Sequence, residues 1–458
     1  MNPDAPNPDE GERVELGTGE RFRKDVRDWL AANLTGEFAQ ARGLGGPGRE
    51  HEAFDVRLAW DRHLARSGLT CLGWPVEHGG RGATLEQQVI FHEEYARAAA
   101  PVRVNHIGEE LLGPTLIAFG TPAQKARFLP EIVAVRELWC QGYSEPGAGS
   151  DLAAVTTRAV RSGEADGDWV ITGQKVWTSL AHLADWCFVL CRTDFTVTRH
   201  HGLSYLLVPM RQPGIEVRPI VQLTGTSEFN EVFFDQARTA ADHLVGAEGQ
   251  GWSIAMATLG FERGVSTLGQ QVGFRREWER VVARARETGA VDDPLIADRI
   301  TQAWIGLQIM RLNALRMLSS SGAAGPEVSI AKLFWAGWHR SLGELAIDVE
   351  GLDGLVAEAE PYELTPAQRL FLFSRADTIY GGSDEVQRTI VAERGLGLPR
   401  ATPPPGPPLG PPLGPPLGRS PVPPTKAALN PVDAGVTGDL GGDRPAAPPT
   451  DPGEGGRR

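Results

Sequence analysis

The chain has 458 residues, enough for two or three domains with sizeable cores. Its 45 Lys and Arg residues stand against 58 Asp and Glu residues, a net charge of −13, which argues against nucleic acid as a general partner. The acidic, polar start MNPDAPNPDEGERVE does not resemble a secretion signal, and no run of about 18 apolar residues predicts a membrane span. Four cysteines in this length indicate reduced thiols and a cytoplasmic protein.

Residues 19–135 are predicted to form a helical domain after a flexible N-terminus over residues 1–18. The segments FRKDVRDWLAANL, FDVRLAWDRHLARSG and LEQQVIFHEEYARAAA place apolar residues three and four positions apart, which is the helical period. The segment TPAQKARFLPEI opens with Thr121, and Gln124 follows three positions later. This pairing is typical of a capped helix start.

Residues 136–247 are predicted to form a β domain. The segments DWVITGQKVWTS, DWCFVLCRTD, GLSYLLVPM, IEVRPI and NEVFFDQ alternate in polarity or form short apolar runs between turn residues. Cys187 and Cys191 lie on one of these strands, at a spacing that places both on the same side. We interpret them as buried core thiols rather than metal ligands, because no further ligand lies nearby at metal spacing.

Residues 248–400 return to long helical patterns, for example VGFRREWERVVARARE and PLIADRITQAWIGLQIMRLNALRML. Residues 401–458 are rich in proline and glycine, and GPPL occurs three times in succession. We predict that this segment is disordered with polyproline II character, because it has little apolar surface to bury. A passive tail is the favoured interpretation, and a docking segment is the alternative.

Two motifs in the β region suggest a site for a flat ligand. In CQGYSEPGAGSDL a glycine-rich turn follows a short strand, so the backbone can approach a ligand closely, and Ser144 and Ser150 add hydroxyl groups. In GQKVWTS, Trp177 offers an aromatic face, and Thr178 and Ser179 offer hydrogen-bonding groups. Together these features suit a planar, polar ring such as a flavin. The alternatives are an ordinary turn and a core tryptophan.

A third motif, TIYGGSDEVQR, precedes an amphipathic run near the end of the predicted helices. Ser383 or Asp384 can cap that helix with a short side-chain acceptor. The two glycines let backbone N–H groups approach a ligand, and a helix N-terminus favours an anion. We interpret the motif as the mouth of a site, with a plain helix cap as the alternative.

These motifs, together with NEVFFDQARTAADHLVG and LGFERG, occur in an order that resembles the acyl-CoA dehydrogenase family over roughly residues 20–398. The resemblance implies an α+β fold with a helical N-domain, a central β-barrel or sandwich domain and a C-terminal four-helix bundle that drives tetramer formation. It also implies FAD, held between the β domain and the C-terminal helices. The positions that match the family's cofactor contacts are Gln141, Tyr143, Ser144, Gly149, Ser150, Trp177, Thr178, Ser179, Ser383 and Glu385. The positions that match its substrate contacts are Ser150, Arg263 and Gly381.

The reaction of this family removes the proton α to a thioester while hydride leaves the β carbon, so a carboxylate must lie within reach of that proton. Many members carry this glutamate directly after the tyrosine of the last motif, where this chain has Gly381. The N–H of Gly381 can still donate to the thioester oxygen. Glu262, in LGFERG, matches the base of isovaleryl-CoA dehydrogenase and its relatives. The alternative is an ion-paired surface glutamate.

Two family motifs that hold the adenine half of FAD, Arg-x-x-Phe-Gly and Gln-x-x-Gly-Gly-x-Gly, are replaced here by ARARETGAVDD and DVEGLDGLVAE. Arg284 or Arg286 are the candidate substitutes. Similar losses occur in the family branch that acts on steroid side chains, where two unlike subunits combine. The adenine half is therefore expected to be held differently or by another subunit.

The predicted function is FAD-dependent dehydrogenation of a branched or otherwise non-linear acyl-CoA or acyl-carrier thioester. Electrons would pass to an electron-transfer flavoprotein, and the assembly would be a homotetramer or a heterotetramer with a homologous subunit. One alternative is a non-catalytic or half-catalytic subunit of such a heterotetramer. A further alternative is a flavin monooxygenase or oxidase on the same fold.

Overall fold

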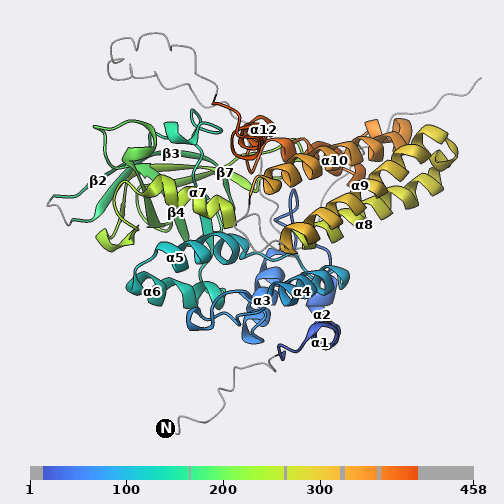
Figure 1. Cartoon of the computed structure of the whole chain (residues 1–458), viewed down its shortest axis with the longest axis horizontal. Helices are drawn as coiled ribbons and strands as arrows, with labels where there is room; N and C mark the ends of the chain where they lie inside the picture. Colours follow the sequence, from blue (N-terminus) through green and yellow to red (C-terminus); the bar gives the residue numbers. More distant parts are fainter. Residues whose placement is uncertain (1–13, 164–166, 262–265, 320–324, 358–362, 401–458) are drawn as a thin grey trace, which may run out of the picture. The chain divides into compact units, whose positions relative to one another are not determined.

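The computed structural model describes residues 14–163, 167–261, 266–319, 325–357 and 363–400. Those residues belong to one compact unit that ends at Arg400. Helices come first, strands follow and helices return, as Figure 1 shows, so the predicted α+β fold is confirmed. The predicted disorder of residues 401–458 lies outside the described residues, as do residues 1–13 of the N-terminal segment 1–18 that was predicted to be flexible. In the described remainder of that segment, Val14 is buried in the core of the first helices. No helix within the described ranges is both long enough and apolar enough to cross a membrane.

The first four helices pack around a core of their own. The apolar positions of the predicted helical periods meet in this core, because each helix turns one apolar stripe inward. Its members include Phe22, Trp60, Leu64, Ile90 and Phe91. The helices of this region are α1 (Gly19–Asn33), α2 (Gly36–Gln40), α3 (Phe54–Arg66), α4 (Leu85–Arg97), α5 (Gly113–Phe119) and α6 (Pro122–Val133).

Helix α6 begins with the predicted capping box. The side chain of Thr121 accepts from the Gln124 N–H at 3.2 Å, and the Gln124 side chain accepts from the Thr121 N–H at 3.0 Å. The amide group of Gln124 also donates to the carbonyl oxygens of Asp242 and Leu244, at 2.6 and 2.8 Å. One side chain therefore closes the start of a helix and connects it to a segment that follows the last long strand.

The strands form a single sheet in the order β6-β7-β3-β2-β4-β5-β8, with β1 paired to β4. The pairs β1–β4 and β2–β4 are parallel, and the other neighbours are antiparallel. The strands are β1 (Trp139–Gly142), β2 (Arg158–Arg161), β3 (Trp169–Ser179), β4 (Trp186–Arg192), β5 (Leu203–Pro209), β6 (Ile215–Pro219), β7 (Phe229–Thr239) and β8 (Leu244–Val245).

The two faces of this sheet bury different clusters. Phe188 and Leu190 of β4 pack against α5, α6 and α7 (Gly251–Phe261), which Figure 1 shows beside the strands. Cys187 and Cys191 point to the opposite face, where β4 and β5 meet residues of β3 and β7. Because side chains of β3, β4, β5 and β7 meet one another on this face, the sheet curves around it. Both cysteines are buried, free thiols on one side of their strand, as predicted.

The last helices form the bundle on which part of the site is built. Its core combines Val281 and Ala285 of α8 with Ile300 of α9 and Leu342 and Leu345 of α10. The helices after α7 are α8 (Ser266–Thr288), α9 (Pro294–Ser319), α10 (Glu327–Glu350), α11 (Pro366–Ser374) and α12 (Asp384–Ile390).

Candidate active site

The glycine-rich turn after β1 is closed by its own backbone. Glu145 and Ala148 exchange two backbone hydrogen bonds, at 3.1 and 3.0 Å, which fold the segment SEPGA back on itself. Gly149 and Ser150 follow on the exposed side of the turn. A side chain built at Gly149 would meet no atom within 4 Å, so the chain leaves open space next to this backbone. Such a turn gives a ligand room to approach the main chain.

A buried ion pair between Lys175 and Glu145, which we did not predict, holds this turn in place. Lys175 of β3 is completely buried, and its ammonium group donates to Glu145 Oε1 at 2.9 Å and to the carbonyl oxygens of Tyr143 and Leu190. The Glu145 carboxylate also accepts from the N–H groups of Thr156 and Thr157, at 2.7 and 2.8 Å.

The surroundings of this pair change both pKa values. Burial acts to raise the pKa of Glu145, but the charge of Lys175 and the hydrogen bonds to the carboxylate outweigh it and lower the pKa to about 2. Burial lowers the pKa of Lys175, and Glu145 offsets only part of that effect. Glu145 is thus held in its ionised form by the buried lysine and by the hydrogen bonds to its carboxylate.

Trp177 stands out from the sheet at a β-bulge. Val176 and Trp177 face the single residue Glu231 on β7, and Trp177 has a left-handed backbone with φ of 61°. Its side chain is 57% exposed, which excludes the interpretation as a core tryptophan. Its ring touches Phe229 edge-on, with the centroids 6.1 Å apart. A bulky residue held in a left-handed conformation and turned toward solvent is a candidate ligand platform.

The bulge also joins the first two motifs. The N–H of Val176 donates to the carbonyl oxygen of Ser144 at 2.9 Å, so the glycine-rich turn and the exposed tryptophan are neighbours. Thr178 is buried, and its hydroxyl has no hydrogen-bond partner in the part of the chain that the structure describes. Ser179 lies on the same strand, opposite Phe229.

Two further predicted cofactor contacts, Gln141 and Tyr143, lie within or next to β1. Gln141 lies within β1, opposite Phe188. The ring of Tyr143 is buried against Phe188 and Tyr205, with centroids 5.8 and 6.2 Å apart. A ligand at the Trp177 side would therefore meet the backbone around Tyr143 rather than its ring.

The third motif is a left-handed turn before α12. Gly381 and Gly382 have φ of 64° and 90°, values that side-chain-bearing residues rarely adopt. The Gln387 side chain of α12 donates to the carbonyl oxygen of Gly381 at 2.9 Å. Ser383 is the predicted cap and accepts from the Val386 N–H at 3.4 Å. Glu385 is exposed, and hydrogen bonds from its own backbone and from Ser383 lower its pKa.

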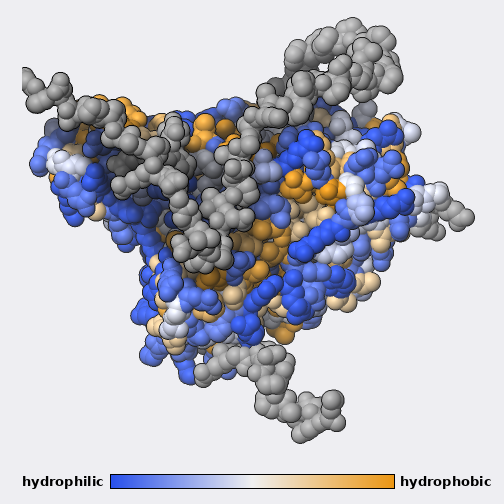
Figure 2. Space-filling view, turned by 180° about the vertical axis from the view of Figure 1, so that it is seen from behind, coloured by the Kyte–Doolittle hydropathy of each residue, from blue (hydrophilic) through white to orange (hydrophobic). Residues whose placement is uncertain are grey.

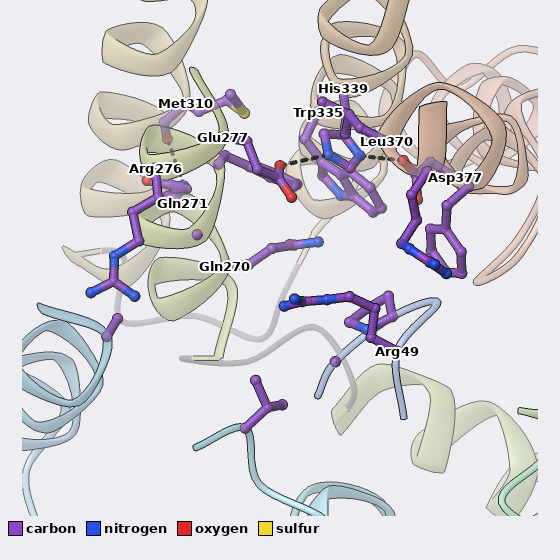
Figure 3. Close-up of a pocket in the computed structure, with 18 of the residues that line it drawn as sticks. Arg49, Gln270, Gln271, Arg276, Glu277, Met310, Trp335, His339, Leu370 and Asp377 are labelled. Carbon is purple, nitrogen blue, oxygen red and sulfur yellow. Dashed lines mark hydrogen bonds and ion pairs between the residues drawn. The ribbon is translucent and has the colours of Figure 1, made fainter. Parts of the chain in front are cut away.

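A cavity of about 1230 Å³ opens beside this turn. Its wall combines the loop over residues 45–52 with α4, α8, α9, α10, α11 and the residues Tyr380 and Gly381. Figure 3 shows the aromatic ring of Trp335 among charged and amide side chains, including Arg49, Gln270 and Glu277. Such a mixture of aromatic and polar groups suits a bulky ligand with an apolar body.

Two predicted site residues cannot be placed. Glu262 and Arg263 lie outside the described residues, immediately after the end of α7 at Phe261. Of the two candidate arginines for the adenine half of FAD, Arg284 lies at the cavity wall and is paired with Glu350 of α10 at 2.8 Å. Its guanidinium group is thus already engaged within the chain.

A charged cluster next to Tyr380 was also missed from the sequence. His339 lies between Asp377 and Glu277, with nitrogen–oxygen distances of 2.5 and 2.8 Å. Burial acts to lower its pKa, but the two carboxylates outweigh burial and raise it to about 9. His339 lies 38 positions from Asp377 and 62 positions from Glu277 in the sequence, so no local motif predicts the cluster.

Comparison with known proteins gives matches along most of the chain. Family profiles described as the N-terminal, middle and C-terminal domains of acyl-CoA dehydrogenase match residues 18–136, 140–237 and 249–396. Acyl-CoA dehydrogenase IpdE1 of Mycobacterium tuberculosis (strain ATCC 25618 / H37Rv) is 64% identical over 383 residues, which are 83% of this chain and 98% of that protein. IpdE1 of Mycolicibacterium smegmatis (strain ATCC 700084 / mc(2)155) is 62% identical over 388 residues, with the same coverage.

Solved structures give a matching result. The Tcur3481-Tcur3483 steroid ACAD superposes with a TM-score of 0.72 at 29% identity and covers 84% of this chain and 100% of that chain. The ChsE4-ChsE5 complex of Mycobacterium tuberculosis has a TM-score of 0.70 at 29% identity, with the same coverage.

Proposed function

Since the chain belongs to the acyl-CoA dehydrogenase family, and is therefore an oxidoreductase, we propose that it uses FAD to convert a bulky acyl thioester into the 2,3-enoyl thioester. The observation that carries this proposal is the contact between the first two motifs. The Val176–Ser144 hydrogen bond places an exposed, left-handed Trp177 beside an open glycine-rich turn. Members of this family generally depend on a flavin, and this arrangement fits one.

The residues around Trp177 have the chemistry that a flavin requires. The tryptophan offers a flat aromatic face, the space at Gly149 admits a ligand close to the backbone, and Ser144 and Ser179 supply hydroxyl groups. The hydroxyl of Thr178, which has no hydrogen-bond partner among the described residues, lies on the same strand as Ser179. We propose that these five residues hold the isoalloxazine and the adjoining phosphates. A bound flavin would accept the hydride that leaves the β carbon of the substrate.

We propose that Glu262 removes the α proton. The backbone at Gly381, with φ of 64°, would strain any side chain, so a glutamate at this position is disfavoured by conformation as well as absent from the sequence. The N–H of Gly381 remains suited to hold the oxygen on which negative charge develops, because donors fixed in advance stabilise such charge. A carboxylate supplied from elsewhere must then take the proton, and LGFERG supplies one.

The cavity supports a large, non-linear acyl group. Its volume of about 1230 Å³ far exceeds what a short straight chain fills, and an aromatic wall around Trp335 suits a rigid apolar ring system. One structural neighbour is described as a steroid ACAD. We therefore propose a polycyclic acyl thioester of steroid origin as the substrate class.

We propose that the chain works in a tetramer with a homologous subunit and passes its electrons to an electron-transfer flavoprotein. Helix α9 exposes Ile305, Ile309, Leu312 and Leu315, which recur at helical spacing and form one stripe, here called the α9 stripe. Figure 2 shows further apolar residues gathered near the centre of one face, between hydrophilic margins. Exposed apolar surface of this extent is typical of a contact with another chain.

A second candidate function is that of a partner-dependent subunit. Arg284, a candidate for holding the adenine half of FAD, is paired with Glu350. Both solved structures are named after two proteins, Tcur3481-Tcur3483 and ChsE4-ChsE5. On this hypothesis the chain completes a site only with an unlike subunit.

The absorption spectrum of the purified chain, recorded without oxygen before and after adding polycyclic and linear acyl-CoAs, separates the two candidates. A yellow protein that a polycyclic thioester bleaches supports the self-sufficient enzyme. Glu262→Gln should then retain the colour and lose the bleaching, whereas Glu248→Gln, a control in the same part of the chain, should bleach normally. A colourless chain that becomes yellow only with a coexpressed homologous subunit supports the second candidate.

A further inference from the structure

Asp377, four positions before Gly381, is buried and makes several hydrogen bonds near the glycine turn. It is 1% exposed, and its Oδ1 accepts from the Tyr380 hydroxyl at 2.6 Å. Its Oδ2 faces His339 at 2.5 Å, and its backbone oxygen accepts from the ammonium group of Lys332. A single residue thus connects the tyrosine that precedes Gly381 to two side chains of α10.

His339 extends this network to a third element. Its other ring nitrogen faces Glu277 of α8 at 2.8 Å, and its ring packs on Phe274 with the centroids 4.5 Å apart. Figure 3 shows the imidazole between the two carboxylates at the cavity wall. With a carboxylate at each nitrogen, the ring is held as a cation that donates on both sides.

The turn itself has little intrinsic rigidity. Two consecutive glycines lose more backbone freedom on ordering than any other pair of residues. Gln387 holds the turn from the α12 side through the carbonyl oxygens of Gly381 and Gly382, at 2.9 and 3.3 Å. On the α10 side, the route Tyr380–Asp377–His339 supplies the second anchor.

We propose that His339 is a positioning residue: through Asp377 and Tyr380 it fixes the glycine turn, and so aims the Gly381 N–H at the thioester oxygen. The inference rests on the proposed function, because it assumes that this oxygen becomes negatively charged. Without the imidazolium, Asp377 and Glu277 lose the cation between them. A buried carboxylate that loses its partner rearranges or takes up a proton, and Tyr380 then loses a fixed acceptor.

Hydrogen exchange tests the structural half of this proposal. We would compare the full-length protein, with any flavin and subunit that copurify, with His339→Gln and with the control His243→Gln. His243 is a part-buried histidine of the β region that pairs with Thr239 and packs on Trp186. In His339→Gln, amides of residues 376–387 should exchange at least about tenfold faster, since a charge-assisted hydrogen bond is worth a decade or more. The control should leave them unchanged.

Unchanged exchange at residues 376–387 in a folded His339→Gln protein would overturn the proposal. If that variant does not fold, Tyr380→Phe removes only the hydroxyl that reaches Asp377 and must produce the same acceleration at the turn. A Tyr380→Phe protein with normal exchange there would overturn the proposal equally.

Acetoacetyl-CoA tests the functional half without turnover. This 3-oxoacyl thioester loses its acidic proton when donors hold its oxygen, and the enolate absorbs in the near ultraviolet. His339→Gln should raise the pKa of the bound probe by at least about one unit, a tenfold loss of enolate stabilisation, with a smaller change in Kd. Faster exchange with an unchanged probe pKa would overturn the aiming of the N–H. A wild-type protein that binds the probe without ionising it would instead contradict the proposed function, while the exchange result still decides the anchor.

Discussion

Position 175 shows how one buried residue can hold the backbone of a site in place. The ammonium group of Lys175 bonds to the carbonyl oxygen of Tyr143 just before the glycine-rich turn, to Glu145 within it and to the carbonyl oxygen of Leu190 on β4. The cost of burying this charge is offset only while all of its acceptors remain in place. The position of the turn therefore depends on the buried ammonium group of Lys175.

Lys175→Met should lower the free energy of unfolding by about 3–5 kcal/mol, because it leaves the Glu145 carboxylate buried without its cation. Lys175→Met combined with Glu145→Gln should recover part of that loss, since no net charge then remains buried. Urea denaturation of the two variants and the wild type measures the difference. A single variant that costs less than about 1 kcal/mol would contradict the structural role that we assign to the pair.

At the scale of single residues, the sequence was most informative where the signal is local. Thr121 and Gln124 lie three positions apart, and their capping box was predicted and is confirmed. Lys175 and Glu145 lie 30 positions apart and meet only because β3 passes beneath the turn. The exposure of Trp177 depends on a bulge, which is a property of strand pairing rather than of the tryptophan.

Helices α8 and α10 and the segment before α12 are held together by a charge that depends on pH. The pKa of His339 is raised from 6.5 to about 9 by Asp377 and Glu277, against the opposing effect of burial. Lys332, which bonds to the Asp377 backbone, is the nearby cation on the same helix as His339. A raised pKa means that the folded state binds the proton more tightly than the unfolded state does.

The stabilisation by His339 should be complete below about pH 6.5 and be lost as pH rises through 9. The full contribution is on the order of 3 kcal/mol, from the shift in pKa. Thermal unfolding of the wild type between pH 6 and 10 should show this alkaline loss, and His339→Gln should lack it. His243→Gln should keep the wild-type profile, because it leaves the cluster intact. A His339→Gln profile parallel to that of the wild type would show that other groups cause the loss.

The cluster of Glu277, His339 and Asp377 could not be predicted from the sequence pattern of any single helix. The helical periods of α8 and α10 were visible in the sequence, and both helices are present. The periods indicate which face is buried, but a histidine on that face is equally compatible with a simple core position. Only the packing of three elements brings Glu277, His339 and Asp377 together.

At the scale of the whole molecule, the fold class and the element order were predictable, because each region repeats one periodic pattern many times. The resemblance to the family added the order of the domains. The shape of the cavity was not predictable, since its wall takes residues from the loop over residues 45–52, from the five helices α4, α8, α9, α10 and α11 and from the turn before α12.

The α9 stripe carries a prediction about assembly. Ile309→Glu combined with Leu312→Glu should shift the protein to smaller species, because charges placed in an apolar interface lose their hydration. Light scattering after size-exclusion chromatography measures the mass. Val76→Glu changes an apolar residue of the N-terminal helical region that is at least as exposed as Ile309 and Leu312, and it should leave the mass unchanged. A double variant with the wild-type mass would place the assembly interface elsewhere.

The bonds from Gln124 to Asp242 and Leu244 bear on whether the regions of this protein are modular. A chain cut between α6 and β1 would keep the capping box but would leave its amide donor without acceptors. The separated β region would likewise lose the donor for two of its carbonyl oxygens. The boundaries between the predicted regions are therefore not boundaries between independently folding units. Transplanting the first helices onto the β region of a relative should succeed only where a residue able to make both hydrogen bonds is transplanted with them.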